Sequence, residues 1–281
     1  MTLPIVLSVI IPANNESRYI GACLQALALQ VDLPAAGAEI IVAANNCTDT
    51  TVIEAEDARA MLEAAGWALR VLDIAEPGKL NALNTADRVA SGRVLAYLDA
   101  DVICERNMMA ALLAALDTDR PMYASGHLKV APPRSFLTQH FAATWQRLPF
   151  MTSNVQGAGL FCVNRAGRTR WGQFPDIIAD DGYVRLMFAP DERVKVDSVY
   201  HWPMVEGFSA LVKVRRRQDA GVRQLAEQFP EIMSNESKLP MGLSDHWSIF
   251  RQGPLSYMIY VAVMVAVKAS KRTPAGWIRG R

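Results

Sequence analysis

Two aspartates that flank a single alanine follow a short apolar run, and together they could bind a metal ion. The run covers residues 93–98, and the carboxylates are Asp99 and Asp101. Such a run suits a buried parallel strand, and open α/β sheets bind ligands at the carboxyl ends of their strands. Two hard oxygen ligands favour Mg²⁺ or Mn²⁺, shared with a diphosphate, over Zn²⁺. The pattern therefore predicts a nucleotide substrate; the alternative is that Asp101 begins a helix and Asp99 is a solvated strand end.

A second pair of carboxylates, Asp180 and Asp181, follows a loop at 172–175 and precedes a predicted helix over 183–188. A carboxylate that lies beside an acceptor hydroxyl can remove its proton as a general base. The alternative is that both residues only cap the amino end of the helix, where negative charge is stabilising.

Polar residues at two further positions are candidates for contacts with the nucleotide. Pro12 to Glu16 follows an apolar run, and a loop there could fold over a base and offer backbone groups and the Asn14 side chain. Lys79 stands at a predicted helix start, where its ammonium group and the free N–H groups could meet a diphosphate. The alternatives are a plain helix cap with Ser17 at the N-cap, and a solvated lysine.

The elements that must position these residues alternate along the first hundred residues. Apolar, β-branched runs predict strands, and apolar residues at helical spacing predict helices between them. The predicted strands are 5–11, 39–43, 68–74 and 93–98, and the predicted helices are 18–30, one that ends near 65, and 79–90. Alternating strands and helices imply an α/β fold, with a doubly wound, mostly parallel sheet and helices on both of its faces.

Several stretches, in the right order, resemble the inverting family 2 glycosyltransferases, which have the GT-A fold. The opening segment is similar at 8–16, the second strand and its base-binding turn at 39–42 and 45–51, and a Gly-Lys-x-x-Ala-Leu-Asn segment at 78–84. Residues 98–101 resemble the family's metal motif, and residues 157–159 resemble its acceptor-side loop. Residues 178–182 resemble the acidic pair that supplies its catalytic base. The resemblance covers roughly residues 5 to 220.

The resemblance implies a role for each candidate residue. Asp99 would lie near the ribose and the metal, and Asp101 would ligate a metal, Mn²⁺ or Mg²⁺, that offsets charge on the leaving nucleotide. Asp181 would be the base, with Asp180 as its neighbour. The implied nucleotide contacts are Pro12, Ala13, Asn14, Glu16, Asn45, Lys79, Asp99 and Arg217, and the implied metal ligands are Asp101, Asp99 and His201.

The sequence departs from the family's pattern at two places. The second strand usually ends in acidic residues that contact the base and ribose, whereas Ala44 and Asn45 stand here, which leaves open how a uracil is read. Processive members carry a Gln-x-x-Arg-Trp segment, and the stretch 214–218 retains only Arg217 of it. This second departure predicts a non-processive enzyme.

Two further alternatives stay open. The first concerns the basic cluster of Lys213 and Arg215–Arg217, which is either a solvated helix face or a contact for the diphosphate. Consecutive arginines on a helix point in different directions, so at least one of them can face the diphosphate. His201 follows a predicted strand over 194–200, and it either completes the metal site or only packs beside Trp202.

Composition limits the class of protein. The 281 residues are 51% hydrophobic and 20% charged, which is typical of one large or two small globular domains with a sizeable core. A net charge of +1 gives no overall attraction to nucleic acid, so none is expected as a partner. Four widely spaced cysteines predict reduced thiols, and the amino terminus lacks the pattern of a signal peptide, so we expect a cytoplasmic protein without disulfides.

The carboxyl-terminal part is less distinctive. We expect a GT-A domain over 1–225, with a nucleotide-binding half over about 1–102 and an acceptor-binding half over about 103–225, and then a helical extension over 226–281. Its apolar run at 255–267 is shorter than the roughly 20 residues that span a bilayer. The run is either a helix buried in the fold or an interfacial helix, whose trailing cations contact the anionic cytoplasmic face of a membrane.

These features together predict an inverting, metal-dependent, non-processive transfer of a sugar from a nucleotide diphosphate sugar, with a UDP-sugar as the expected donor. The acceptor would bear a hydroxyl group, as in a saccharide, a lipid-linked sugar, or an exopolysaccharide or glycolipid precursor. A nucleotidyltransferase is a second hypothesis, but it would carry a Gly-rich loop after the first strand, and Pro12 to Glu16 contains no glycine. A donor-binding subunit without activity is a third, and retention of both acidic pairs counts against it.

Overall fold

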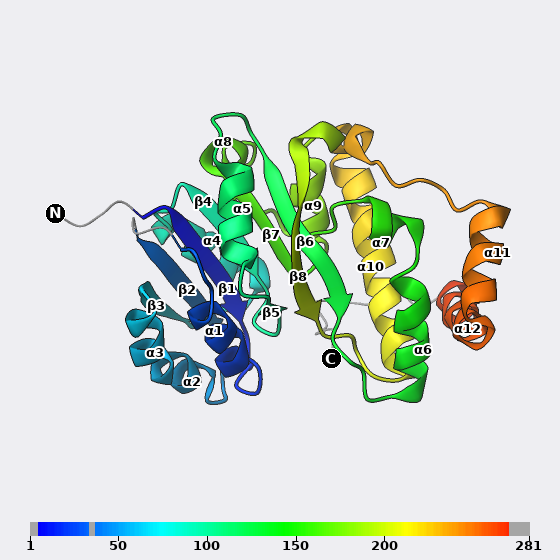
Figure 1. The fold of residues 1–281 in the computed structure, drawn as a ribbon, viewed down its shortest axis with the longest axis horizontal. Helices are drawn as coiled ribbons and strands as arrows, with labels where there is room; N and C mark the ends of the chain where they lie inside the picture. The colour runs from blue at the N-terminus through cyan, green and yellow to red at the C-terminus, as the bar shows by residue number, and fades with distance from the viewer. Residues whose placement is uncertain (1–4, 34–36, 270–281) are drawn as a thin grey trace. The chain divides into compact units, whose positions relative to one another are not determined.

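The computed structural model describes residues 5–33 and 37–269, and the chain forms two compact units (Figure 1). Unit 1 contains Met1–Leu128, Val155–Asp176 and Met187–His201, and unit 2 contains Lys129–Asn154, Ile177–Leu186 and Trp202–Arg281. The domain boundary expected near residue 225 falls inside helix α10 (Phe208–Gln228), which belongs to unit 2. The domain ranges expected from the sequence stay a prediction.

Unit 1 is built on an eight-stranded sheet with the strand order β3-β2-β1-β4-β7-β6-β8-β5. The first four strands are parallel, whereas β7 runs antiparallel to β4 and to β6, and β5 runs antiparallel to β8. The strands are β1 Leu7–Ala13, β2 Ala38–Asn45, β3 Trp67–Ile74, β4 Val94–Leu98, β5 Ile103–Cys104, β6 Tyr123–Val130, β7 Leu160–Asn164 and β8 Arg193–Trp202. The mostly parallel sheet predicted from the first hundred residues is therefore confirmed.

The parallel strands β1, β2 and β4 are buried on both faces, which explains their nearly continuous apolar sequences, whereas the edge strand β3 is partly exposed. Every residue of β2 and of β4 is buried, and β1 is buried at all positions but Pro12. A buried polar exception is Glu39 in β2, whose carboxylate accepts hydrogen bonds from the Ser8 hydroxyl and from the backbone and hydroxyl of Ser91. Helices cover such sheets because both faces must be shielded from water.

The helices of unit 1 mostly follow the predicted pattern. They are α1 Ile20–Ala28, α2 Thr51–Asp57, α3 Arg59–Ala64, α4 Lys79–Val89, α5 Met108–Leu116, α8 Arg165–Arg168 and the 3₁₀ turn η1 Pro190–Glu192. The single helix expected to end near residue 65 is instead a pair, α2 and α3, which meet at Ala58 because its ψ of −10° turns the chain. In Figure 1 both are drawn in the blue shades of the first part of the chain.

A buried carboxylate joins α4, β4 and α8 within unit 1. Asp87 of α4 accepts a hydrogen bond of 3.0 Å from the Tyr97 hydroxyl and forms an ion pair with the Arg168 guanidinium. Arg168 also donates to the carbonyl oxygens of Trp171 and Gly172. Burial, followed by the charge of Asp87, raises the pKa of Tyr97 well above its usual value, so the phenol stays protonated and remains a donor.

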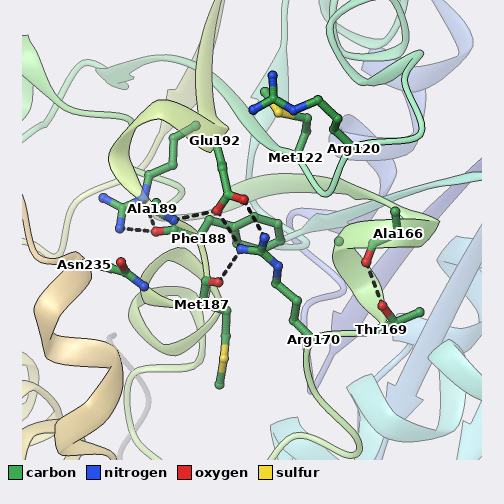
Figure 2. A network of polar contacts seen from close by, with 12 residues as sticks. Arg120, Met122, Ala166, Thr169, Arg170, Met187, Phe188, Ala189, Glu192 and Asn235 are labelled. Carbon is green, nitrogen blue, oxygen red and sulfur yellow. Dashed lines mark hydrogen bonds and ion pairs between the residues drawn. The ribbon is translucent and has the colours of Figure 1, made fainter.

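A second network fixes the chain before β8 (Figure 2). The Arg170 guanidinium donates to both carboxylate oxygens of Glu192, at 2.6 and 2.5 Å, and to the carbonyl oxygen of Met187 at 2.6 Å. Glu192 also accepts a hydrogen bond from the backbone N–H of Ala189, and Arg170 lies 4.6 Å from the Phe188 ring centroid. This bidentate pairing of Arg170 with Glu192 is geometrically specific, and each of its charged hydrogen bonds is roughly twice as strong as a neutral one.

Unit 2 is mainly helical and has its own apolar core. Its helices are α6 Phe136–Trp145, α7 Pro149–Ser153, α9 Asp180–Leu186, α10, the 3₁₀ segment η2 Pro230–Asn235, α11 Leu243–Gln252 and α12 Pro254–Ala269. The core contains Phe141, Leu211, Val212, Val263 and Val267, so α6, α10 and α12 pack together, as Figure 1 shows.

Helix α12 contains the apolar run at 255–267, for which the sequence left two alternatives open. Val263 and Val267 of this helix lie in the core of unit 2, whereas Leu255, Met258 and Val265 are exposed. One face of the helix is therefore part of the fold, and the opposite face is apolar and accessible. Within the described ranges, no helix has the combination of length and apolar character needed to cross a membrane.

Candidate active site

The loops that follow β1 and β2 are tied to each other by asparagine side chains. The Asn14 amide donates to the carbonyl oxygens of Asn45 and Asn46, at 2.6 and 3.2 Å. The Asn15 side-chain oxygen accepts hydrogen bonds from the backbone N–H groups of Thr48 and Asp49, at 2.6 and 3.2 Å. Strands β1 and β2 are parallel neighbours, so their carboxyl ends lie at one edge of the sheet. The two loops therefore form one braced structure.

Two of these asparagines adopt a backbone conformation that most residues avoid. Asn15 has φ of 53° and Asn46 has φ of 49°, and asparagine is among the few side chains enriched in this left-handed region. The sequence pattern singled out Asn14 and Asn45 but missed Asn15. The signal that was available is the Asn-Asn doublet itself, which occurs at the end of both strands.

The start of α1 is held by the same neighbouring loop. The backbone N–H of Glu16 donates to the Thr51 hydroxyl at 2.8 Å, and that of Ser17 donates to the Asp49 carboxylate at 3.3 Å. Partial burial disfavours the charged form of Asp49, but hydrogen bonds from Thr51 and Ser17 hold its pKa below the usual value. Helix α1 begins only at Ile20, so the idea that Ser17 is its N-cap is wrong.

Asn45 is buried, and its side chain is bonded to the segment before α4. Its amide oxygen accepts a hydrogen bond of 2.6 Å from the backbone N–H of Gly78, and its amide nitrogen donates to the carbonyl oxygen of Glu76. Gly78 has φ of 135°, which an L-residue side chain rarely tolerates. These contacts fix the residue that immediately precedes Lys79, which suits Asn45 to positioning this lysine.

Lys79 is the first residue of α4, and its ammonium group lies 3.2 Å from a carboxylate oxygen of Asp99. Both side chains are only partly exposed. The amino end of a helix offers N–H groups that lack helical partners and a positive dipole end, both of which favour an anion. The structure thus brings together Lys79, the start of α4 and Asp99, which sequence reasoning assigned to one diphosphate site.

The Asp99-Ala100-Asp101 segment lies between β4 and the two-residue strand β5. The next helix, α5, begins at Met108, so the alternative that Asp101 starts a helix is wrong. The backbone N–H of Asp99 donates to the carbonyl oxygen of Gly159 at 2.9 Å, which joins the metal motif to the glycine loop at 157–159. Both motifs therefore lie together in unit 1.

The glycine loop at 157–159 also lies against two buried tyrosines, Tyr123 and Tyr200. The Tyr200 hydroxyl donates to the carbonyl oxygen of Ala158 at 2.9 Å. A Cβ atom added to Gly157 would lie 1.8 Å from the Tyr123 hydroxyl oxygen, and the φ of Gly157 is 81°. A glycine is thus required at this position both by space and by backbone conformation. Sequence reasoning missed these two tyrosines, because their partners are distant in the chain.

Strand pairing relates His201 to the segment that follows the two aspartates. Strands β5 and β8 are antiparallel, and His201 pairs with Ile103, two residues after Asp101. This register places His201 on the strand that pairs with β5, the strand that follows the aspartate motif. Within the described part of the chain, no three His, Cys, Asp or Glu side chains are grouped closely enough to hold a metal by themselves.

The chemistry of these residues nevertheless fits a divalent ion that is shared with a substrate. Mg²⁺ is commonly bound by one or two carboxylates together with substrate phosphates, rather than by a complete set of protein ligands. Asp99 and Asp101 supply two such carboxylates just after the carboxyl end of β4, and Asp99 lies beside the positive end of α4. The donor set therefore fits a metal–diphosphate complex and does not fit an isolated structural metal.

The second acidic pair lies in unit 2, in the first turn of α9. Asp180 is buried, and Asp181 is half-buried, with its Oδ1 accepting a 2.7 Å hydrogen bond from the backbone N–H of Gly182. A carboxylate in a first helical turn is stabilised by the helix dipole. Both residues thus lie at the start of a helix, as the capping alternative expects. The Asp181 carboxylate is partly exposed and so could still act as a base.

The arginines of α10 differ in their partners. Arg215 donates to Gln218 and Asp219, and Arg216 donates to the carbonyl oxygen of Ala266 in α12. Arg217, the residue assigned to the nucleotide, is half-buried on the same helix in unit 2. Two members of the basic cluster therefore have a structural role in unit 2.

Comparison with known proteins gives a family and a fold. A family model described as Glycosyl transferase family 2 matches residues 8–170 of this chain, which is more than half of its length. A comparison with curated proteins found no significant match.

Solved structures with similar folds cover between 79% and 99% of this chain. The mannosyltransferase PcManGT from Pyrobaculum calidifontis, solved with GDP-Man and Mn²⁺, is 23% identical, with 98% of this chain and 76% of that chain covered and a TM-score of 0.58. S. aureus TarS 1-349 in complex with UDP is 16% identical, with 99% and 95% covered and a TM-score of 0.52. Glucosyl-3-phosphoglycerate synthase from Mycobacterium tuberculosis, solved with Mn²⁺ and UDP, is 18% identical, with 79% of each chain covered and a TM-score of 0.53. At these identities the likeness shows a GT-A fold.

Proposed function

Since the chain belongs to glycosyltransferase family 2, we propose that it transfers one sugar from a nucleotide diphosphate sugar to a hydroxyl acceptor with inversion at the anomeric carbon. The observation that carries the donor assignment is the meeting of Lys79, the start of α4 and Asp99 at one edge of the sheet. A lysine and a helix amino end suit a diphosphate. The braced loops after β1 and β2 lie at the same edge and suit the nucleoside.

A uridine nucleotide is the proposed donor base. TarS and glucosyl-3-phosphoglycerate synthase have been solved with UDP, and both resemble this chain in fold. PcManGT was solved with GDP-Man, so guanosine is the competing base. The Asn45 side chain is buried and bonds Glu76 and Gly78, so we assign the base contacts to the loop at Pro12–Glu16.

We assign Asp101 and Asp99 to a divalent ion, Mn²⁺ or Mg²⁺, and propose His201, which pairs with Ile103, as a further ligand. A bound ion of this kind supplies positive charge to the leaving diphosphate. Lys79 pairs with Asp99 and would offset part of the same charge. In this chain, Asn45 and the Gly157–Gly159 loop hold these groups in place.

Asp181 is the proposed general base, with Asp180 as its neighbour. The support is its match to the family's acidic motif and its place in the first turn of α9, where the carboxylate is held by Gly182 and stays partly exposed. A base of this kind removes the proton of the acceptor hydroxyl as its oxygen attacks the anomeric carbon from the face opposite the nucleotide. Arg217 of α10 is proposed as a further contact for the donor.

The proposed acceptor is a saccharide or a glycolipid precursor that is reached from the cytoplasmic side. Non-processive transfer is supported by the departure from Gln-x-x-Arg-Trp, of which only Arg217 remains. A lipid-linked acceptor is supported by the exposed apolar face of α12.

The test is titration calorimetry with UDP in the presence of Mn²⁺ or of EDTA, combined with a screen for hydrolysis of nucleotide sugars. We expect UDP to bind at least about tenfold more tightly with Mn²⁺, and Asp101→Asn to abolish that difference. Glu105→Gln changes an exposed carboxylate nearby in the sequence and serves as the control. Equal UDP affinity with Mn²⁺ and EDTA would exclude the proposed metal-dependent site.

A further inference from the structure

Helix α12 is apolar on two opposite faces, and only one of them is covered. The covered face contributes Val263 and Val267 to the core with α6 and α10. The other face exposes Leu255, Met258 and Val265, which are spaced by three and seven residues and therefore form one stripe along the helix. A helix that is apolar all round is normally buried on all sides. The exposed stripe therefore calls for a further apolar partner.

Helix α11 adds exposed apolar residues beside α12. Leu243 is 89% exposed and Trp247 is 61% exposed, and their spacing of four residues places them on one face of α11. The two helices are joined by a 2.7 Å hydrogen bond between the His246 ring and the Tyr257 hydroxyl. We call Leu243, Trp247, Leu255, Met258, Val261 and Val265 the α11–α12 apolar surface.

Basic residues accompany this surface. Arg251 in the last turn of α11 and Lys268 in the last turn of α12 are both exposed, and α12 contains no acidic residue. Residues 237–281 contain seven Lys and Arg but a single acidic residue, Asp245, whereas the whole chain has a net charge of only +1. The carboxyl-terminal segment is thus strongly basic and the rest of the chain is acidic.

We propose that the α11–α12 apolar surface binds an anionic lipid bilayer. Apolar side chains of a surface helix can enter the boundary between headgroups and acyl chains, tryptophan favours that boundary, and nearby cations are attracted to anionic headgroups. The positive charge of the carboxyl-terminal segment favours a bilayer over a second copy of the chain as the partner. A second copy would bring the same basic segment, and the like charges would repel each other.

Binding to a bilayer would also determine where the enzyme meets its acceptor. This second inference rests on the proposed function, whereas the lipid binding does not. A chain that docks on a bilayer through unit 2 would meet an acceptor that carries a lipid anchor. Removal of α12 cannot test this idea, because Val263 and Val267 belong to the core of unit 2. Substitutions on the exposed stripe are needed instead.

The experiment is flotation of the full chain with vesicles of phosphatidylcholine, either alone or mixed with phosphatidylglycerol, at low and high salt. The test variant is Leu255→Gln/Val265→Asn, and the matched control is Leu29→Gln/Val222→Asn. Leu255 and Leu29 are 50% and 51% exposed, and Val265 and Val222 are 58% and 56% exposed. The two variants therefore carry identical changes at equally exposed positions.

We expect the wild type and the control variant to float with anionic vesicles at low salt, and the test variant to lose at least about tenfold in bound fraction. High salt and neutral vesicles should both weaken binding. Absence of the wild type from the anionic vesicle fraction at low salt would overturn the proposal. So would equal flotation of the two variants, or a salt-stabilised dimer that only the test variant fails to form.

Hydrolysis of UDP-sugars in solution, without vesicles, separates this proposal from the proposed function. Both variants should hydrolyse the donor at the wild-type rate, because none of the four changed residues is assigned to the site. If no variant turns over any nucleotide sugar while flotation behaves as expected, the proposed function fails and the lipid proposal stands.

Discussion

At the scale of single residues, the candidate site depends on asparagines that bond to the chain's own backbone. Asn14, Asn15 and Asn45 all have side chains that hold neighbouring loops. Asn45 is the most consequential, because it is buried and bonds both Glu76 and Gly78. Its role in the molecule is thus one of positioning the start of α4.

We expect Asn45→Ala to lower the free energy of unfolding by about 1–3 kcal/mol, because two hydrogen bonds, to the Gly78 N–H and to the Glu76 carbonyl oxygen, are lost. Hydrogen exchange at the Gly78 amide should accelerate, and UDP should bind more weakly because Lys79 is no longer fixed. Asn81→Ala is the control, since the exposed Asn81 side chain donates to the same Glu76 carbonyl oxygen. Equal hydrogen exchange at Gly78 in the two variants would contradict this role for Asn45.

Asp181→Asn keeps the shape of the side chain and removes its basicity. Turnover should therefore fall by about 10² or more, whereas UDP affinity should stay unchanged. Steady-state kinetics and calorimetry measure the two quantities separately. Near wild-type turnover would show that Asp180 or another group is the base.

The candidate residues were predictable to different degrees. Asp99, Lys79 and Asn45 could be found because each directly follows an apolar run or starts a helix at a strand end. Tyr123 and Tyr200 could not, since their roles depend on partners more than 30 residues away, Gly157 for Tyr123 and Ala158 for Tyr200. Local patterns contain no information about such partners.

At the scale of elements, the four parallel strands of unit 1 were predicted to within two residues at both ends. Three of them, β1, β2 and β4, were recognisable because burial on both faces demands continuous apolar sequence. The antiparallel strands β6 and β7 were not predicted. Tyr123–Val130 combines a buried first half with a partly exposed second half, so neither a continuous run nor a strict alternation marks it. The pairing of β5 with β8 also depends on the folded chain and not on local sequence.

The Arg170–Glu192 pair is expected to make the stability of unit 1 depend on pH. Hydrogen bonds from Arg170, and then one from the Ala189 backbone, hold the pKa of Glu192 below its usual 4.5. A lowered folded-state pKa means that the stabilisation is present above pH 4.5 and is lost as the pH falls through the folded-state value.

We expect Glu192→Gln to lower the free energy of unfolding by about 1–2 kcal/mol at pH 7, and by less as the pH falls below 4.5. Denaturant unfolding at pH 7, 5 and about 3 measures the difference. Glu63→Gln is the control, because Glu63 is well exposed and its contact with Arg59 is 3.5 Å long. A difference between wild type and Glu192→Gln that is constant over this pH range would refute the assignment.

At the scale of the whole molecule, the sequence predicts a transferase that releases its product after one addition. Polymer-holding relatives carry a glutamine and a tryptophan around the arginine that corresponds to Arg217, and this chain has Val214 and Gln218 at the flanking positions. We expect a single mass increment per acceptor molecule by mass spectrometry, even with a large excess of donor. A ladder of additions on one acceptor would contradict this prediction.

The braced loops after β1 and β2 have a consequence for the kinetics of donor exchange. Because the side chains of Asn14 and Asn15 hold these loops together through the chain's own hydrogen bonds, the nucleoside would order little backbone on arrival. Association should then be limited by encounter and desolvation, and it should be similar for uridine and guanosine diphosphates. Discrimination between the two bases would accordingly appear as a difference in residence time.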